Sequence, residues 1–381
     1  GGFSVERSVV QTGRNIPQAS RGLNPPYNID EQGDTDCEVK HRVPADCLPR
    51  FSIARILHTS MPIALVSRFP CVQALQHIVE AQQFDREVMA QIFSVAREME
   101  QVVKRYGSSI LNRRVMATLF YEPSTRTRLS FESAMRRLGG DVITTESAQE
   151  FSSAAKGETL EDTIRIIAGY ADVIVLRHFE SGASKRAAAV SPVPIISAGD
   201  GPGQHPTQAL LDVYTIRREI GHLDDIRIAM VGDLANGRTV RSLCYLLAKY
   251  DNPNITFVAP EVVRMRDDIK EYLSRHSIDW CEVSDLADVA SEVDVIYQTR
   301  IQRERFGDRV GDYEKARGRY VIDRSILERM RDDAVVMHPL PRVDEIVADE
   351  VDDDPRAAYF RQAHNGLYVR MALLRMILEA D

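Results

Sequence analysis

The feature that most constrains the fold is a regular alternation that begins near Leu75 and continues to the C-terminus. Short apolar runs rich in Val and Ile alternate with amphipathic stretches of about a dozen residues. Strands that are each followed by a helix pair in parallel, and parallel sheets are covered by helices on both faces. The eight apolar runs cover residues 115–120, 141–145, 172–176, 193–197, 226–231, 255–259, 293–297 and 334–337.

The order of these runs predicts an α/β protein of two domains, each a parallel sheet covered by helices. The first four runs form one sheet and the last four form the other, and a helix over 206–220 crosses between them. We place the domains at residues 73–210 and 211–356, and we expect a C-terminal helix within 357–381 to complete the first domain. The expected active site is the cleft between the two domains.

The composition is that of an ordinary globular protein. Of 381 residues, 44% are hydrophobic and 27% are charged, and the net charge is −8, from 48 basic against 56 acidic side chains. This acidic balance argues against general nucleic-acid binding, and no apolar run approaches the roughly 18 residues of a membrane span. The five cysteines are scattered without a C-x-x-C pair. We therefore expect a soluble intracellular protein with no disulfide framework and no zinc site.

Residues 1–72 differ from the rest and form an N-terminal extension. Up to Asn28 the one acidic residue is Glu6, against Arg7, Arg14 and Arg21, and serines are frequent. This composition resembles an organelle transit segment, which would place the protein in a plastid rather than the cytoplasm. A disordered extension, or one added during cloning, explains the same composition equally well.

Polar side chains follow six of the eight apolar runs directly. Ligands of open parallel sheets bind beyond the carboxyl ends of the strands. Solvated loops would contain more Lys, Glu and Asp than these do, so we predict one convergent, electropositive site. The six segments are E-P-S-T-R-T-R (122–128), R-H (177–178), A-G-D-G-P-G-Q-H-P-T-Q (198–208), G-D-L-A-N-G-R-T (232–239), Q-T-R-I-Q-R-E-R-F (298–306) and H-P-L-P-R (338–342).

The turn at 122–128 predicts a phosphate site. Ser124, Thr125 and Thr127 lie where a helix begins, and backbone N–H groups and the helix dipole favour an anion there. Arg126 adds a guanidinium that can hold two phosphate oxygens at once. A helix N-cap alone would need one hydroxyl, worth about 1 kcal/mol, and not three hydroxyls with a guanidinium.

The stretch 232–239 leaves an alternative open. It matches the nucleotide-binding pattern G-x-x-x-x-G-K-[ST] except that Arg238 replaces the lysine. Arginine differs in shape from the slim lysine of that loop, and no clear magnesium-binding aspartate follows a second strand. We interpret Arg238 as a carboxylate clamp, with a nucleotide hydrolase as the rival hypothesis. A third possibility is a sensor that binds an anion or an amino acid without reaction.

His205 begins a predicted helix in the segment G-Q-H-P-T-Q. A helix N-terminus disfavours the charged imidazole, and a neutral ring can polarise a carbonyl through one N–H. Arg300 and Gln302 could hold a carboxylate. In 338–342 two prolines restrict the backbone, which could direct carbonyl oxygens at an amino group.

These segments together resemble the carbamoyltransferase family, and within it the aspartate carbamoyltransferases. The resemblance runs from about residue 75 to the C-terminus through seven ordered motifs, whereas residues 1–72 have no counterpart in the family core. The segment F-S-S-A-A-K-G-E-T-L-E-D-T most resembles the corresponding segment of plant-type members, which act in plastids. The motifs are S-T-R-T-R, K-G-E-T, L-R-H, G-D-G-x-x-Q-H-P-T-Q, G-D-L-x-N-G-R-T, Q-T-R-I-Q-x-E-R and H-P-L-P-R.

The resemblance implies transfer of a carbamoyl group from carbamoyl phosphate to L-aspartate in pyrimidine (UMP) biosynthesis. An ornithine-using relative would carry H-C-L-P in the last loop and an acidic partner for the ornithine ammonium. This chain has H-P-L-P and several arginines, which suit the two carboxylates of aspartate. The resemblance assigns Arg238, Arg300 and Gln302 to aspartate.

The resemblance also implies how carbamoyl phosphate is held. The four residues of the turn 124–127 would bind its phosphate, and Thr127, Arg177 and His205 would donate to its carbonyl oxygen. Its amino group would contact Gln208 and the backbone carbonyls of a loop that contains Pro339, Leu340 and Pro341.

Further implications concern assembly and cofactors. Ser152 and Lys156 match a loop that reaches into the site of a neighbouring subunit, which implies a homotrimer with shared active sites. Residues 73–210 become the carbamoyl-phosphate-binding domain and 211–356 the aspartate-binding domain. The departing phosphate can accept the amine proton, so no protein base, metal or organic cofactor is required.

Overall fold

The computed structural model of the protein describes residues 75–146, 148, 157–301, 306, 311, 313 and 318–379. All the elements described below belong to one compact unit, Val66–Asp381. Within the described residues, no helix combines the length and the apolar character needed to cross a lipid bilayer.

The first half of this unit is built on a parallel sheet with strand order β2-β1-β3-β4. Its described elements, in chain order, are η1 (Ala81–Gln83), α1 (Arg86–Lys104), β1 (Val115–Phe120), α2 (Thr125–Arg137), β2 (Asp141–Glu146), α4 (Leu160–Ile167), β3 (Val173–His178), α5 (Ala183–Val190) and β4 (Ile195–Asp200).

The second half is built on another parallel sheet, with strand order β7-β6-β5-β8-β9. The described elements from the connecting helix onward are α6 (Pro206–Ile220), β5 (Arg227–Val231), α7 (Arg238–Leu247), β6 (Asn254–Val258), η3 (Glu261–Val263), α8 (Asp267–Arg275), β7 (Asp279–Val283), β8 (Val295–Gln298), α10 (Arg324–Arg329), β9 (Val335–Met337), α11 (Ala348–Val351) and α12 (Tyr359–Leu378).

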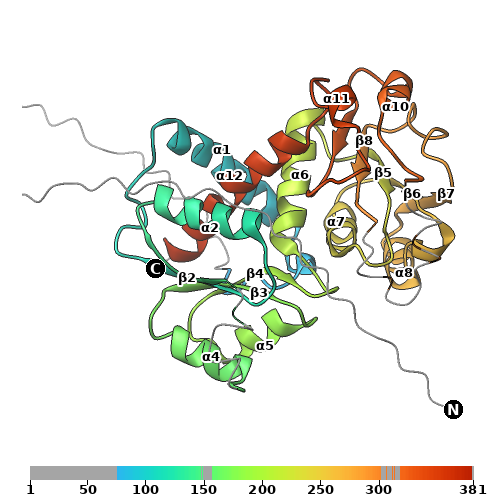
Figure 1. Cartoon of the computed structure of the whole chain (residues 1–381). Helices are drawn as coiled ribbons and strands as arrows, with labels where there is room; N and C mark the ends of the chain where they lie inside the picture. The colour runs from blue at the N-terminus through green and yellow to red at the C-terminus, as the bar shows by residue number, and fades with distance from the viewer. Residues whose placement is uncertain are drawn as a thin grey trace, which may run out of the picture. The chain divides into compact units, whose positions relative to one another are not determined.

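Helices cover both faces of the first sheet. Figure 1 shows α1, α2 and α12 on one face and α4 and α5 on the other. The strands supply apolar side chains to both layers because successive residues point to opposite faces. Met116 of β1 joins the core beneath α2, whereas Ala117 joins the core with Leu160 and Ile164 of α4.

The helix ends near the site are determined by local sequence. α2 stops where Gly139 takes φ +87, a conformation that favours glycine over any side chain. α6 begins with Pro206, whose missing N–H is not needed in the first turn, and ends at Gly221 with φ +94. These signals place α6 at the residues predicted for the connecting helix.

The C-terminal helix α12 packs against α1, α2 and α6. Val369, Ala372 and Leu373 are fully buried in this contact. Burial of apolar surface contributes about 25 cal/mol of stability per Å². α12 is therefore a main contributor to the core of the first half.

The α/β fold with two parallel sheets confirms the prediction from the apolar runs, and all eight runs contain strands. Two details differ. β4 begins only at Ile195, because Pro194 has no N–H for the sheet. The edge strand β7 was missed, because its half-exposed sequence D-W-C-E-V contains two acidic residues and lacks an apolar run.

Candidate active site

The polar segments predicted from the sequence lie at the carboxyl ends of the strands. The turn at 122–127 follows β1, Arg177 lies at the end of β3, and His205 follows β4. In the second sheet, Arg238 opens the helix after β5, and the loop from His338 follows β9. Hydrogen bonds join the segments at Glu122, Arg177 and Arg238, so these three strand ends lie together in space.

The turn that opens α2 has hydrogen-bond donors that are not used within the helix. Ser124 occupies the N-cap position, but its side chain accepts no capping hydrogen bond from the first turn. The first-turn N–H groups of a helix have no partner within the helix. Arg126 is exposed and forms no hydrogen bond or ion pair with any described residue, and partial burial lowers its pKa. Thr127 is buried.

Arg128 of the same turn has a different role. Its guanidinium contacts Glu146 at 2.7 Å and Glu132 at 3.3 Å. It therefore ties α2 to the edge strand β2, and its charge is neutralised within the first half of the unit. Only one of the two arginines of the turn is available to a ligand.

Three candidate side chains converge on one backbone position, Gly199. A Cβ placed there would lie 3.3 Å from Arg177 Nη1, from the Arg238 guanidinium carbon and from His205 Cδ2. We call Gly199, Arg177, His205 and Arg238 the Gly199 cluster. Gly199 itself takes φ +109, a conformation that favours glycine. The absent side chain leaves the space in which the three functional groups meet.

Glu122 holds the two guanidinium groups of the Gly199 cluster. Its carboxylate contacts Arg177 Nη2 at 3.1 Å and Arg238 Nη1 at 3.3 Å. Arg238 also donates to the carbonyl of Gly201 at 2.6 Å, and Arg177 donates to that of Ala198 at 3.0 Å. Burial alone would raise the pKa of Glu122, but Arg238 and Arg177 hold it below its ordinary value.

The cluster is electropositive despite this carboxylate. Burial and the nearby charge of Arg238 lower the pKa of Arg177 to about 10, although Glu122 opposes the shift. The Arg177 guanidinium stays charged at neutral pH, because even this pKa lies well above 7. Two buried cations, with Arg126 close enough to affect Arg177, thus face one carboxylate, and this imbalance favours an anionic ligand.

His205 is neutral in this setting. Burial, Arg238, Arg177 and Arg370 all lower its pKa well below 6.5. The sequence predicted a lowered pKa for His205 because it lies at a helix N-terminus. The structure agrees on this direction, but burial is the main cause of the shift. Its Nδ1 atom is buried without a hydrogen-bond partner. A neutral imidazole with unused hydrogen-bonding capacity can donate to a substrate carbonyl oxygen.

Gln208 lies one turn further along α6 and is buried. Its Nε2 atom donates to Asp212 Oδ1 at 2.8 Å. Asp212 also accepts from Gln362 of α12 at 2.7 Å and from the hydroxyl of Tyr297 in β8 at 2.7 Å. Burial raises the pKa of Asp212 to about 7, and the hydrogen bonds from Gln362, Tyr297 and Gln208 limit the rise.

The loop after β9 is held in an unusual backbone conformation. Leu340 takes φ +57, and the Leu340–Pro341 peptide bond is cis. His338 Nδ1 accepts from the N–H of Leu340 at 2.7 Å, so its proton lies on Nε2, which contacts Glu345 at 2.8 Å. The backbone N–H of His338 donates to Gln362 at 2.9 Å. Pro339 is half-buried and Pro341 is exposed.

The remaining predicted residues are placed less fully. Arg300 follows β8 and is half-buried. Gln302, Ser152 and Lys156 lie outside the described residues. Among the described residues, no group of three or more His, Cys, Asp or Glu side chains is positioned to hold a metal ion.

The arrangement argues against a nucleotide-hydrolysing loop at 232–239. Within that loop Asp233 accepts from the backbone and side-chain nitrogens of Asn236 at 3.1 and 3.0 Å. The guanidinium of Arg238 contacts Glu122 and Gly201, which belong to the first half of the unit. It is thus directed at the other sheet and not over the loop, where a phosphate-binding lysine would lie.

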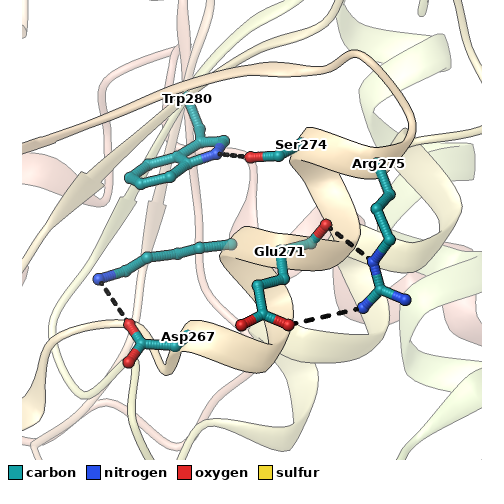
Figure 2. Close-up of a pocket in the computed structure, with 6 residues that line it drawn as sticks. Asp267, Glu271, Ser274, Arg275 and Trp280 are labelled. Atoms are coloured by element: carbon teal, nitrogen blue, oxygen red, sulfur yellow. Dashed lines mark hydrogen bonds and ion pairs between the residues drawn. The ribbon is translucent and has the colours of Figure 1, made fainter.

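A groove elsewhere in the second half is a poor site for this chemistry. It has a volume of about 560 Å³ and lies between α8 and the edge strand β7. Figure 2 shows that its polar groups satisfy one another: Trp280 donates to Ser274 at 3.0 Å, and Arg275 contacts Glu271. None of the predicted site residues lines it.

Three residues of the site were missed by sequence reasoning. Glu122 looked like part of a turn, and Gly199 looked like an ordinary loop glycine. Asp212 carried a signal that was not used, because it is a lone carboxylate within the apolar helical stretch A-L-L-D-V-Y, four residues after Gln208. A buried charge of this kind is kept in a helix only with partners.

Comparisons with known proteins agree with this site. Residues 76–218 match the family model "Aspartate/ornithine carbamoyltransferase, carbamoyl-P binding domain", and residues 224–377 match "Aspartate/ornithine carbamoyltransferase, Asp/Orn binding domain". Aspartate carbamoyltransferase 3, chloroplastic, of Pisum sativum is 67% identical over 80% of this chain and 78% of its own length. The corresponding enzyme of Oryza sativa is 66% identical over 80% of this chain and 85% of its own.

Solved structures give the same result. The catalytic subunit of Methanocaldococcus jannaschii aspartate transcarbamoylase is 50% identical, with a TM-score of 0.74 over 80% of this chain and 98% of that one. The Trypanosoma cruzi enzyme in complex with carbamoyl phosphate and aspartate is 39% identical, with a TM-score of 0.75 over 79% of this chain and 96% of that one. The chain belongs to the aspartate carbamoyltransferases, within the aspartate/ornithine carbamoyltransferase family.

Proposed function

We propose that the Gly199 cluster and the α2 turn transfer a carbamoyl group from carbamoyl phosphate to the amine of L-aspartate. The products are N-carbamoyl-L-aspartate and phosphate, in the de novo pyrimidine pathway. The observation that carries the assignment is the meeting of two buried guanidinium groups and one neutral imidazole around Gly199. The Trypanosoma cruzi relative, whose structure contains both substrates, supports it.

The phosphate would be held by the turn that opens α2. Ser124, Thr125 and Thr127 supply hydroxyl groups, and Arg126 has no competing partner among the described residues. The helix N-terminus adds backbone donors and a favourable dipole. A small, doubly charged substrate can be bound mainly through its phosphate in such a site.

The carbonyl end would lie among Thr127, Arg177 and His205. The aspartate amine attacks the carbonyl carbon, and the carbonyl oxygen takes up negative charge in the tetrahedral intermediate. Donors directed at that oxygen stabilise it, and each is worth about 10²–10³ in rate in other enzymes. The bond from carbon to the phosphate oxygen then breaks, and the amine proton passes to the departing phosphate.

The carbamoyl amino group needs acceptors. Gln208 and the backbone carbonyls of Pro339 and Leu340 would provide them, and Pro341 would restrict the loop. The φ of +57 at Leu340 is a strained conformation for a branched side chain, and strained backbone of this kind is found at ligand sites.

Aspartate would be held by Arg238, Arg300 and Gln302. Arg238 lies beside Arg177, so a carboxylate of aspartate bound to Arg238 would be close to the reacting carbonyl. Orientation of two substrates in this way can lower a barrier by several kcal/mol, up to roughly 7–11 kcal/mol at the ideal limit. We assign 73–210, completed by 357–381, to carbamoyl phosphate and 211–356 to aspartate.

The assembly would be a homotrimer in which Ser152 and Lys156 reach the site of a neighbouring subunit. Leu129 of α2 and Ile143 of the edge strand β2 are exposed apolar residues in the same half of the unit as the turn that opens α2. Such residues support a subunit interface at this edge. The chloroplastic relatives favour a plastid location for the protein.

One experiment tests activity, acceptor and assembly together. The purified protein is assayed with carbamoyl phosphate and either aspartate or ornithine, and its mass in solution is measured. We expect carbamoylaspartate, no carbamoylornithine, and three times the chain mass of 42.9 kDa. Product from ornithine, or turnover of ATP with magnesium in place of either reaction, would refute the assignment.

A further inference from the structure

Asp212 lies outside the substrate contacts proposed above, yet it is the most connected polar side chain near them. It is fully buried on α6 and accepts three hydrogen bonds of 2.7–2.8 Å. The donors come from three elements: Gln208 of α6, Gln362 of α12 and Tyr297 of β8. Buried carboxylates are expensive to desolvate, so a carboxylate with three donors calls for an explanation.

The carboxylate determines which end of the Gln208 amide faces the substrate. An ionised carboxylate can only accept hydrogen bonds, whereas an amide has one donor end and one acceptor end. Gln208 Nε2 must therefore face Asp212 Oδ1, which leaves Oε1 on the opposite end of the amide. That oxygen can accept a hydrogen bond from the amino group of a carbamoyl substrate. If the Gln208 amide were flipped, its own N–H₂ would face the amino group of the substrate, and two donors would oppose each other.

The same carboxylate determines the orientation of Gln362. Its Nε2 donates to Asp212 Oδ1 at 2.7 Å, so its Oε1 is free to accept the backbone N–H of His338 at 2.9 Å. His338 begins the loop whose carbonyl groups are the other proposed acceptors, and it also holds the N–H of Leu340 at 2.7 Å. One oxygen atom thus orients the acceptors on both sides of the amino group.

From this connectivity we propose that Asp212 is a positioning residue that selects the amino group of the carbamoyl substrate. It does so by presenting acceptors alone, through Gln208 on one side and through Gln362 and the His338 loop on the other. The inference rests on the proposed function and deepens it, because it names a determinant of substrate choice that does not touch the substrate. A methyl group in place of the amino group would gain nothing from these acceptors.

Protonation of Asp212 would remove the selection on the Gln208 side. A proton on Oδ1 can be donated to Oε1 of a flipped Gln208, while Oδ1 still accepts from Gln362 and Oδ2 from Tyr297, so the flipped amide is satisfied as well and Gln208 no longer presents an acceptor alone. Burial raises the pKa of Asp212 to about 7. The titratable groups that face it are Arg370 of α12, whose charge lowers this pKa, and Tyr297 of β8; neutral His205 lies one turn before Gln208.

The sign of the pH effect follows from this ionisation. The acceptor-only state requires the ionised form, so selection of the amino group is present above about pH 7 and is lost as the pH falls below it. Tyr297 donates to the ionised form and therefore lowers the pKa of Asp212. Tyr297→Phe removes this donor, raises that pKa and moves the loss of selection to higher pH.

The test measures binding of two stable probes that differ in one group. Phosphonoacetamide carries the amino group, and acetonylphosphonate carries a methyl group in its place; each is titrated by calorimetry into the wild-type protein and its variants at pH 8. We expect the wild type to prefer the amide, and Asp212→Leu, which has no oxygen to hold the two amides, to lose about 10-fold or more of that preference, as for an unpaired buried hydrogen bond. Binding of the methyl probe should stay within twofold.

A matched control separates selection from packing. Thr215 Oγ1 accepts from Asn365 of α12 at 3.0 Å, which is another buried polar contact between α6 and α12. Thr215→Val should lower stability without changing the ratio of the two affinities. A second comparison uses Gln208→Ala, in which Asp212→Leu should lower the ratio by less than it does alone, because the contribution through Gln208 is already lost and only the one through Gln362 remains.

The outcomes separate the inference from the proposed function. If the wild type binds neither probe, the proposed function fails. If the wild type prefers the amide and Asp212→Leu keeps that preference, or loses both probes equally, the inference alone is refuted. Should Asp212→Leu fail to fold, Tyr297→Phe decides: its preference for the amide should weaken at a higher pH than in the wild type, and an unchanged pH profile would overturn the proposal.

Discussion

Gly199→Ala should damage the active site although it adds only one methyl group. The new Cβ would lie 3.3 Å from each of three candidate groups, on Arg177, His205 and Arg238. Contacts this short require each neighbour to move by a few tenths of an ångström. The three groups surround the methyl, so they must move apart from one another.

Two costs can be estimated from the structure. The backbone of Gly199 at φ +109 is unfavourable for alanine, which costs about 1–3 kcal/mol of unfolding free energy. Displacement of catalytic groups by about 1 Å can cost about 10²-fold in rate. For smaller shifts of three groups at once, we expect kcat/KM for aspartate to fall by about 10- to 100-fold.

Gly221→Ala is the matched control, because it separates backbone strain from displacement. Gly221 caps α6 at φ +94, and a Cβ there would have no heavy atom within 4 Å. Both variants should lose similar stability in urea denaturation, but only Gly199→Ala should lose activity in a carbamoylaspartate assay. If Gly199→Ala retains kcat/KM within twofold of Gly221→Ala, the convergence of the cluster has no catalytic meaning.

Three further predictions follow from the site. Arg126→Ala should nearly abolish carbamoylaspartate formation with little change in the urea midpoint, since Arg126 has no ion pair with a described residue; near-normal turnover would exclude it as the phosphate ligand. Inactive Lys156→Ala and inactive Arg126→Ala subunits, co-assembled, should regain part of the activity if sites are shared between subunits, and an absence of recovery would point to self-contained sites. The pKa of His205 lies well below 6.5, so below about pH 6.5 the unfolded chain binds a proton that the folded protein does not, and stability falls with falling pH. His205→Asn should flatten this fall by up to about 1.4 kcal/mol per pH unit in denaturation measured from pH 7 to 5, and an unchanged slope would mean that His205 does not stay neutral.

Most of the fold could be predicted because its signals are local. Apolar runs such as 226–231 are buried on both faces and carry a strong pattern, and Pro206 and Gly221 delimit α6 within the sequence itself. β7 could not be found in this way. It forms the exposed edge of the second sheet, and an edge strand needs few apolar residues.

The candidate site likewise contains residues that the sequence could predict and residues that it could not. Arg177, His205 and Arg238 could be named because each follows a strand, and the ends of parallel strands lie together. Glu122 and Asp212 could not, because their importance depends on partners far away in the chain. Glu122 contacts Arg238, 116 residues away, and Asp212 contacts Gln362, 150 residues away.

The sequence by itself therefore determined the α/β architecture, the strand ends that carry donors, and the resemblance that points to aspartate as acceptor. These are properties of short segments, in which side-chain period and turn residues act locally. Only the tertiary structure decided how the donors are used. It placed three of them around Gly199, paired Arg128 within the fold while leaving Arg126 available, and joined Gln208 to the His338 loop through Asp212. Charges and hydrogen bonds depend on distance in space, which residue order does not specify.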